Sequence, residues 1–333
     1  MKFNRFYQDT ITIQNLLRAW EAFLSGKKKK SDVVLFQAKL MDNIFELRHE
    51  LMAKTYIHGG YHSFNISDPK PRNIHKASVR DRLLHHLLYQ ELHLYFERQF
   101  IYDSYSCRLT KGTHRAIRRF DYLTRKVSKN NTRTCWILKC DIRKFFANIA
   151  HDTLKAIFAK YIEDKDIIFL LNRVIDSFNT PGRIGVGLPL GNLTSQLFVN
   201  VYMNEFDQFV KHRLHVKYYI RYADDFVLLS ENKEWLCQQI PKMSEFLGNK
   251  LKLALHPDKV FIKTLASGVD FLGWVHFPQH HVLRTATKTR MMRRIKNHST
   301  DEILQSYLGL LTHGNAYRLQ EKVINIYGLL KNN

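Results

Sequence analysis

The stretch YYIRYADDFVLLS, residues 218–230, places two acidic residues between two apolar runs. The runs Tyr218–Tyr222 and Phe226–Leu229 are rich in aromatic, β-branched and aliphatic residues, which predicts two strands. The Ala-Asp-Asp segment between them predicts the tip of a hairpin. Adjacent carboxylates repel each other, but a bound divalent cation makes their proximity favourable. Asp224 and Asp225 therefore indicate either a metal site or a solvated acidic turn, and the rest of the chain has to distinguish the two.

The chain is strongly basic. Its 333 residues include 52 Lys and Arg against 30 Asp and Glu, which gives a formal net charge of +22. The hydrophobic fraction of 45% is typical of a globular protein, and the length is sufficient for two or three subdomains. This charge attracts polyanions, so nucleic acid is the first expected partner and an anionic membrane surface the second.

Features of membrane-spanning and secreted proteins are absent from the sequence. No segment is apolar over the ~18 residues that a membrane-spanning helix needs, and the N-terminal segment MKFNRFYQDTITIQ is too polar for a signal peptide. The cysteines lack zinc-binding spacing, so we expect reduced, mostly buried thiols in a cytoplasmic protein. They are Cys107, Cys135, Cys140 and Cys237. The histidine pairs at 85–86 and 280–281 have no ligand partner at i+3 or i+4, so we expect solvated or internally hydrogen-bonded rings.

Hydrophobic periodicity divides the N-terminal part of the chain into helices and one hairpin. Residues 1–55 and 81–101 show helical spacing, whereas residues 56–80 contain Gly, Pro and Asn between short β-like runs. Residues 104–140 contain ten Lys or Arg and one acid, Asp121, and predict a helix with a basic face.

The central part of the chain alternates strands, loops and helices. The run TCWILKCDI, residues 134–142, predicts a strand that ends at Asp141, and a helical pattern follows it. A loop rich in Gly and Pro, residues 179–192, precedes a long helix from Leu193 to about Arg213. Further strands are expected in LKLALHPDKVFIKT and VDFLGWVHF. Before them we expect a helix with a kink at Pro241, and after them a helical C-terminal segment.

Asp141, Asp224 and Asp225 form the group of residues that we expect to carry out catalysis. Transfer of a nucleotidyl group uses two divalent ions about 3.5–4 Å apart, and Mg²⁺ needs only a few carboxylate ligands because it keeps waters or phosphate oxygens. If the strand that ends at Asp141 pairs with the hairpin, its carboxylate meets Asp224 and Asp225. The alternative role for Asp141 is an N-cap of the helix that follows.

Other candidate residues surround these three acids in the sequence. Phe146 lies five residues after Asp141, where a ring would exclude a 2′-hydroxyl, or would simply pack in the core beside Phe145. Gly191, in GLPLGNLTSQ (187–196), permits close approach of a base or phosphate at a helix N-terminus. The alternative is an ordinary helix cap at Asn192 or Thr194.

Basic residues in two turns are candidates for contact with a triphosphate. Lys70 and Arg72, in SDPKPRNI, lie near the tip of the predicted hairpin and would neutralise phosphate charge, or are plain surface charge. Lys259, in LHPDKV, would protonate a leaving pyrophosphate, or is a solvated turn lysine.

Taken in order, these motifs resemble those of reverse transcriptases from about residue 50 to about residue 315. A YADD hairpin, an upstream Asp-x-x-x-Phe-Phe strand and a glycine loop between them are a specific combination. The resemblance rests on SVRDRLLHHLLYQEL, SYSCRLTKGTHRAI, WILKCDIRKFFANI, GLPLGNLTSQLFVNVYMNEFDQFV, RYADDFVLL, LALHPDK and FLGW.

The subfamily that the sequence resembles is that of diversity-generating retroelements. Most bacterial enzymes related to group II intron proteins carry Gln and Pro where this chain has Leu190 and Gln196. The segments LPLGNLTSQ, KGTHRA and SYLGLLTHGNAYRL are similar to those of the retroelement enzymes. The resemblance implies copying of a template-repeat RNA into cDNA with errors at adenines, together with a small basic oligomeric accessory protein. The resemblance places the two departures beside the templating base, where they would lower fidelity.

The resemblance implies an α+β fold of right-hand polymerase architecture, with fingers, a palm of antiparallel sheet backed by helices, and a small helical thumb. The expected boundaries are residues 1–135 for the N-terminal helices and fingers, 136–280 for the palm, with a helical insertion of the fingers at about 155–185, and 281–333 for the thumb. Basic thumb residues would follow the template–primer backbone, which makes binding salt-dependent.

The family's functional residues transfer to matching positions of this chain. Asp141, the Ile142 carbonyl and Asp224 would hold two Mg²⁺ ions, with Mn²⁺ as a substitute, and Asp225 and Lys259 would complete the catalytic group. The residues implied to bind the deoxynucleotide are Lys70, Arg72, Phe146, Leu190, Gly191 and Gln196. The residues implied to contact template RNA and cDNA primer are Arg108, Lys111, Gly273, Trp274, Arg290, Arg293 and Arg294.

Other hypotheses predict other features. A retron or phage-defence reverse transcriptase would share the acids, but the Val-Thr-Gly signature of retrons is absent from the sequence. A group II intron protein would need further residues for a maturase or endonuclease domain, and an RNase H domain does not fit in this length. A non-catalytic RNA-binding protein on a polymerase scaffold would not need all three acids.

Overall fold

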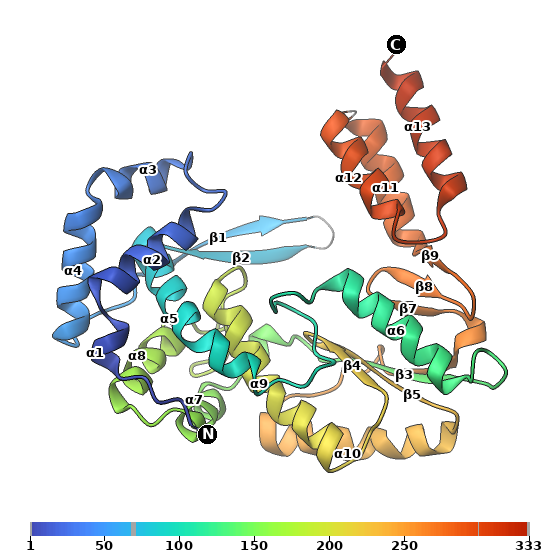
Figure 1. Cartoon of the computed structure of the whole chain (residues 1–333), viewed down its shortest axis with the longest axis horizontal. Helices are drawn as coiled ribbons and strands as arrows, with labels where there is room; N and C mark the ends of the chain where they lie inside the picture. The colour runs from blue at the N-terminus through green and yellow to red at the C-terminus, as the bar shows by residue number, and fades with distance from the viewer. Residues whose placement is uncertain (1, 68–70, 299, 332–333) are drawn as a thin grey trace.

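The computed structural model describes residues 2–67, 71–298 and 300–331 (Figure 1). Helices at the N-terminus, a central antiparallel sheet and a group of C-terminal helices follow one another along the chain. The fold therefore mixes helices with antiparallel sheets, as expected. None of the helices within the described ranges is both long and apolar enough to cross a membrane.

The N-terminal helices confirm the helical prediction for residues 1–55. They are α1 (Tyr7–Thr10), α2 (Ile13–Leu24), α3 (Ser31–Ala38) and α4 (Leu40–Met52). Leu16, Trp20 and Phe23 are among the buried residues on one face of α2, and this face packs against α5 (Val79–Glu97). Spacing of three and four residues places these side chains on one side of the helix.

A two-stranded hairpin projects from this helical layer (Figure 1). Strands β1 (Tyr61–Ile66) and β2 (Arg72–Ala77) pair antiparallel, with Tyr61 opposite Ala77. The hairpin predicted for residues 56–80 is thus confirmed. Most of its side chains are exposed, so its position depends on contacts near its base.

The central sheet contains four strands in the order β4-β5-β3-β6, each antiparallel to its neighbours. The strands are β3 (Trp136–Asp141), β4 (Tyr219–Tyr222), β5 (Asp225–Ser230) and β6 (Phe261–Thr264). The strands predicted on either side of the Ala-Asp-Asp segment, and the one that ends at Asp141, are confirmed. Of the segment LKLALHPDKVFIKT, only the end forms a strand of the sheet, namely β6.

Helices cover both faces of this sheet. They are α6 (Thr113–Val127), α9 (Leu193–His212) and α10 (Lys233–Leu251). Leu138 and Phe226 face the larger core, which includes residues of α9 and α10. Ile137 and Val227, one position along each strand, face a second core that includes residues of α6. The alternation follows from the two-residue period of a strand. Helix α10 continues through Pro241.

The helical pattern predicted after β3 forms two helices, not one. A 3-10 turn (Phe146–Asn148) leads to α7 (His151–Tyr161) and then to α8 (Lys165–Asp176). The break falls at Ile162–Asp164, where the Asp164 carboxylate accepts hydrogen bonds from the backbone of Asp166 and Ile167. An Asp in this position caps the second helix.

The C-terminal part consists of a small sheet and three helices. Its elements are β7 (Val269–Phe271), β8 (Trp274–His276), β9 (His281–Leu283), α11 (Thr285–Asn297), α12 (Asp301–Leu311) and α13 (Tyr317–Lys331). The strand predicted in VDFLGWVHF is a tight hairpin, because Leu272 and Gly273 both have positive φ, at 52° and 89°. A third core forms around Trp274 and Met291.

All four cysteines are free thiols. Cys135 and Cys140 are buried, but Cys107 and Cys237 are exposed. The expectation of mostly buried thiols is therefore correct for two and wrong for the other two, because the sequence around the exposed pair does not show which side of its element faces solvent.

Candidate active site

Strand pairing brings the three acids of the sequence prediction to one end of the central sheet. Asp141 lies directly opposite Asp225 in the register of β3 and β5. Residues opposite each other in an antiparallel pair have Cα atoms about 4.5–5.5 Å apart. The Ile142 backbone N–H donates to the Asp224 carbonyl at 3.2 Å. The acids that are distant in sequence are therefore neighbours in space.

The turn that carries Asp224 is held from inside the protein. Ala223 has a φ of 56°, in the left-handed region, which a non-glycine residue adopts only when its surroundings impose it. The Arg221 guanidinium donates to the Ala223 carbonyl at 3.1 Å and to both carboxylate oxygens of Asp207 at 2.8 and 2.6 Å. Both side chains of this pair are fully buried. The pair connects the hairpin to α9 and fixes the turn.

The electrostatics of the site favour a bound cation. Burial and the neighbouring carboxylate of Asp141 raise the pKa of Asp224, with Lys259 and Arg72 acting in the opposite direction. Burial also raises the pKa of Asp225 to about 7, although Lys139 lies 3.3 Å from its carboxylate. The Asp225 Oδ1 is buried and accepts no hydrogen bond from the described residues. An all-oxygen donor set with an unsatisfied oxygen fits a hard divalent cation such as Mg²⁺.

Lys259 lies beside the first acid. Its Nζ is 3.2 Å from each carboxylate oxygen of Asp141, and the backbone N–H of His256 donates to the Asp141 carbonyl at 2.7 Å. The Lys259 side chain is also 47% exposed. It can therefore reach both the carboxylate group and a ligand that arrives from solvent.

The glycine loop is joined to the β1–β2 hairpin. The His75 N–H donates to the Leu190 carbonyl at 2.9 Å, and the Asn192 side-chain amide donates to the His75 carbonyl at 2.8 Å. Asn192 precedes α9 but makes no side-chain capping bond there, so the simple capping role is not observed for it. These contacts position the basic hairpin near the acids, where Arg72 acts on the pKa of Asp224.

Gly191 is required by its surroundings. Its φ is 99°, and a Cβ at this position would lie 2.7 Å from the Ile74 side chain. Any larger residue would therefore push the loop away from the hairpin. Gln196 lies in the first turns of α9, where its N–H donates to the Asn192 carbonyl at 3.3 Å.

Phe145 and Phe146 have different environments. Phe145 is 3% exposed and belongs to the large core, whereas the half-buried ring of Phe146 packs against the edge of this core. The Phe146 carbonyl accepts a hydrogen bond from the Leu188 N–H at 2.9 Å. The Phe146 backbone is thus held between the end of β3 and the glycine loop, and its side chain is only partly buried.

Two of the side chains expected at the template–primer are covered by protein. The expected contact of Arg108 with the template–primer is corrected. Its guanidinium donates to Glu97 and to the carbonyls of Ile101 and Ser104, and its side chain is only 5% exposed. Trp274 is a second correction, because it is 1% exposed within the third core. Both roles were inferred from motif position, which does not show which way a side chain points.

The remaining candidates lie in other elements of the fold. Gly273 lies in the β7–β8 turn, and Lys111 donates to the Tyr102 carbonyl at 2.8 Å. The three arginines expected to follow the nucleic acid are on α11; they are Arg290, Arg293 and Arg294. Lys70 lies outside the described residues.

Sequence reasoning missed two residues that shape the site, Arg221 and Lys139. Each is a single cation within an otherwise apolar strand, in YYIRY and WILKCD. A charge at such a position needs a partner in the interior, and this was the available signal. Arg221 forms a buried ion pair with Asp207. The Lys139 Nζ lies 3.3 Å from the Asp225 carboxylate and donates a hydrogen bond to the Asp270 carbonyl at 2.9 Å.

An antiparallel sheet that presents clustered acids below a basic hairpin is suited to nucleotidyl transfer. A family model described as "Reverse transcriptase (RNA-dependent DNA polymerase)" matches residues 66–276. The protein belongs to the reverse transcriptase family and is an RNA-directed DNA polymerase. The expected α+β class is confirmed, because helices pack around antiparallel sheets.

Relatives of the chain include bacterial proteins. Protein YkfC of Escherichia coli is 26% identical over 305 residues, which cover 78% of this chain and 76% of that protein. The group II intron-encoded protein LtrA of Lactococcus lactis is 23% identical over 205 residues, which cover 42% of this chain and only 34% of LtrA. Among solved structures, apo telomerase of Candida tropicalis aligns with a TM-score of 0.48 at 13% identity, over 72% of this chain and 59% of that one.

Proposed function

We propose that this protein copies an RNA template into cDNA by two-metal-ion addition of deoxynucleotides to a primer. Asp141, Asp224 and the Ile142 carbonyl would hold two Mg²⁺ ions, for which Mn²⁺ is a substitute, and Asp225 supports them. The observation that carries this proposal is the register that places Asp141 opposite Asp225, beside an acid whose pKa burial also raises. Bound ions would activate the primer hydroxyl and neutralise the triphosphate.

The surrounding side chains have roles that their contacts support. Lys139 keeps Asp225 in place through its 3.3 Å contact. Lys259, at 3.2 Å from Asp141 and half exposed, is placed to give a proton to the leaving pyrophosphate. Arg72 on the hairpin neutralises phosphate charge, together with Lys70. Gly191 and its neighbours line the nascent base pair.

The lobes of the fold have matching roles in this proposal. Residues 136–280 form the palm, residues 1–135 the N-terminal helices and fingers, and residues 281–333 the thumb. The basic residues of α11 follow the template–primer backbone, and Lys111 and the turn at Gly273 contact it nearer the palm. We propose that this polymerase reaction takes place in the cytoplasm.

We expect Phe146→Ala to admit ribonucleotides. Its backbone is joined to the glycine loop and its side chain is only partly buried, so removing the ring would open space for a 2′-hydroxyl. A clash that costs about 3 kcal/mol corresponds to a selectivity of about 100-fold, and most of this should be lost. Primer extension on an RNA template with deoxyribonucleotides or ribonucleotides measures the change.

The matched control for this change is Phe169→Ala on α8, since Phe169 is a partly exposed ring away from the sheet. It should leave selectivity as in the wild type. If Phe146→Ala gains no ribonucleotide incorporation while it still extends with deoxyribonucleotides, Phe146 serves only the core.

We propose further that the enzyme belongs to a diversity-generating retroelement. In this role it copies a template-repeat RNA into cDNA mutagenised at adenines, with a small basic oligomeric accessory protein as partner. The support is Leu190, in the loop that meets the hairpin through the Leu190 carbonyl, together with Gln196 at the start of α9. A leucine here offers no side-chain hydrogen bond to a base or to the loop.

Leu190→Gln should lower the error rate several-fold, because its amide adds hydrogen bonds beside the nascent pair. We leave Gln196 unchanged, since a proline there would remove its hydrogen bond to the Asn192 carbonyl within α9. Sequencing of cDNA made from a defined RNA measures the errors at each base. Leu109→Gln, at a 57% exposed position, is the control. Equal error spectra for Leu190→Gln and the wild type would refute the role of this residue.

A further inference from the structure

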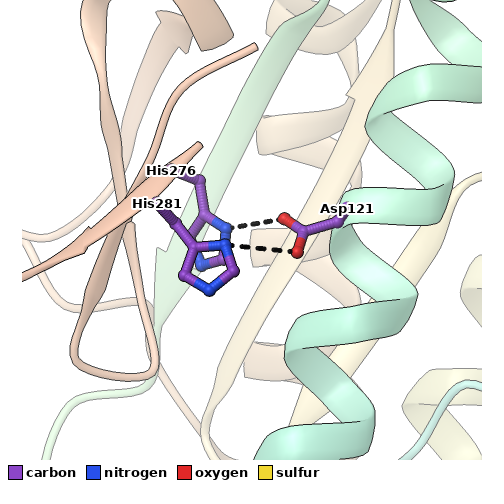
Figure 2. A group of neighbouring side chains, drawn as sticks. All are labelled: Asp121, His276 and His281. Atoms are coloured by element: carbon purple, nitrogen blue, oxygen red, sulfur yellow. Dashed lines mark hydrogen bonds and ion pairs between the residues drawn. The ribbon is translucent and has the colours of Figure 1, made fainter. Parts of the chain in front are cut away.

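A second group of possible ligands lies between α6 and the β8–β9 hairpin, apart from the acids of the central sheet (Figure 2). The His276 Nδ1 is 2.8 Å from the Asp121 Oδ1, and the His281 Nδ1 is 3.4 Å from the Asp121 Oδ2. One ligand atom from each residue lies within 4.8 Å of the others. The internal hydrogen bonding expected for His281 is observed, and its partners come from other elements of the fold, which spacing along the sequence does not reveal.

Regular secondary structure fixes the three side chains. His276 and His281 are directly opposite each other in the register of β8 and β9, so both rings project from the same face. Asp121 projects toward them from the middle of α6 (Figure 2). The His276 side chain is buried, whereas those of His281 and Asp121 are 17% and 32% exposed. An ion could therefore enter from one side of a preformed site.

The hydrogen bonds of His281 leave its Nδ1 facing Asp121, where this nitrogen can take either a proton or a metal ion. Its Nε2 lies 2.6 Å from the His313 carbonyl oxygen, which can only accept, so Nε2 carries a proton. In the neutral ring, Nδ1 then presents a lone pair to the Asp121 carboxylate, which is repulsive. A cation between the two removes the repulsion. A backbone carbonyl that accepts from the second ring nitrogen is also the usual support of a metal-bound histidine.

We propose that Asp121, His276 and His281 bind one Zn²⁺ ion, with water in the remaining position. Imidazole nitrogens with one carboxylate suit Zn²⁺ better than Mg²⁺. Ligands at about 2.0–2.1 Å in a tetrahedron lie about 3.4 Å from one another. The contact between His281 and Asp121 has this length, whereas the 2.8 Å contact of His276 is a hydrogen-bond distance that has to lengthen when the ion binds. This site goes beyond the proposed polymerase centre, which uses oxygen ligands only.

The proposed ion would fix the base of the C-terminal helices. Apart from its ring contact to His313, His281 exchanges backbone hydrogen bonds with Asn315, whose N–H donates to the His281 carbonyl at 3.0 Å and whose side chain accepts from the His281 N–H at 3.3 Å. Both partners lie in the loop between α12 and α13. Binding at Asp121 would thus link α6 to this loop through a single residue.

Metal titration tests the proposal. The untagged full-length chain is stripped with a chelator and titrated with Co²⁺, a spectroscopic substitute for Zn²⁺, in excess Mg²⁺ that fills the carboxylate site. We expect one equivalent of bound Co²⁺ with visible absorption of a low-coordinate nitrogen and oxygen site, displaced by one equivalent of Zn²⁺. His281→Gln and Asp121→Asn should weaken binding by at least about 100-fold.

The control is His280→Gln, the neighbouring histidine, whose ring stacks on Phe277 at 4.9 Å; it should bind as the wild type does. Circular dichroism checks that each variant is folded. The proposal is overturned if the folded wild type takes up no stoichiometric Co²⁺, or if His281→Gln and Asp121→Asn bind it as well as the wild type. Asp224→Asn should still bind Co²⁺ at this second site. A failure of the polymerase proposal can therefore be distinguished from a failure of the zinc proposal.

Discussion

Asp224→Asn should reduce primer extension on an RNA template by at least about 1,000-fold, which corresponds to the loss of about 4 kcal/mol of transition-state stabilisation. The amide keeps the shape of the side chain but removes the negative charge that would hold the ions. RNA binding should stay within about twofold of the wild type, because it depends on phosphate contacts of the basic surface. Gel-based extension and filter binding with the same RNA measure the two properties.

The control for this variant makes the same chemical change at an exposed acid of a nearby loop. Asp258→Asn, one residue before Lys259, should extend primers as the wild type does. Extension by Asp224→Asn at a normal rate would show that the metal assignment is wrong. Loss of RNA binding together with extension would indicate a structural role for Asp224, and inactivity of the wild type on any primed RNA would favour the non-catalytic alternative.

Asp207→Ala should lower the free energy of unfolding by about 3–5 kcal/mol. Its carboxylate accepts from Arg221 at 2.8 and 2.6 Å and from the Tyr219 hydroxyl at 2.8 Å, and it is fully buried. Without it, the Arg221 guanidinium keeps its charge in the interior, where its remaining partners, which include Ser104, Asn200 and the Ala223 carbonyl, carry no negative charge. Urea unfolding followed by circular dichroism measures the loss.

An exposed ion pair provides the comparison for this change. Asp166→Ala removes the partner of Lys54, and both side chains of that pair are more than a third exposed, at 38% and 45%. Its cost should stay within about 1 kcal/mol. The double variant Asp207→Leu with Arg221→Met should recover part of the loss, because no charge is then left buried. A small effect of Asp207→Ala, similar to that of Asp166→Ala, would contradict the anchoring role of this pair.

Local sequence was sufficient for most of the elements and for the position of the three acids at strand ends. The alternation on either side of the Ala-Asp-Asp segment predicted β4 and β5, and WILKCD predicted β3 with Asp141 at its end. The glycine loop before α9 and the hairpin near residue 70 were also predicted. These features depend on side-chain size, branching and turn preference within a few residues, so a short stretch of chain contains the information.

Contacts between distant segments were decided by packing alone. Residues of β3 and β5 could pair in several registers, and only burial of both sheet faces selects the one that sets Asp141 opposite Asp225. Packing also determines the direction of side chains. It buries Arg108 and Trp274 in the interior, although their motifs suggested contact with nucleic acid. The meeting of Asp121 with His276 and His281 has no signal in residue spacing, because three separate elements create it. Spacing along a chain specifies neighbours only within one element, whereas close packing of whole elements determines which side chains meet.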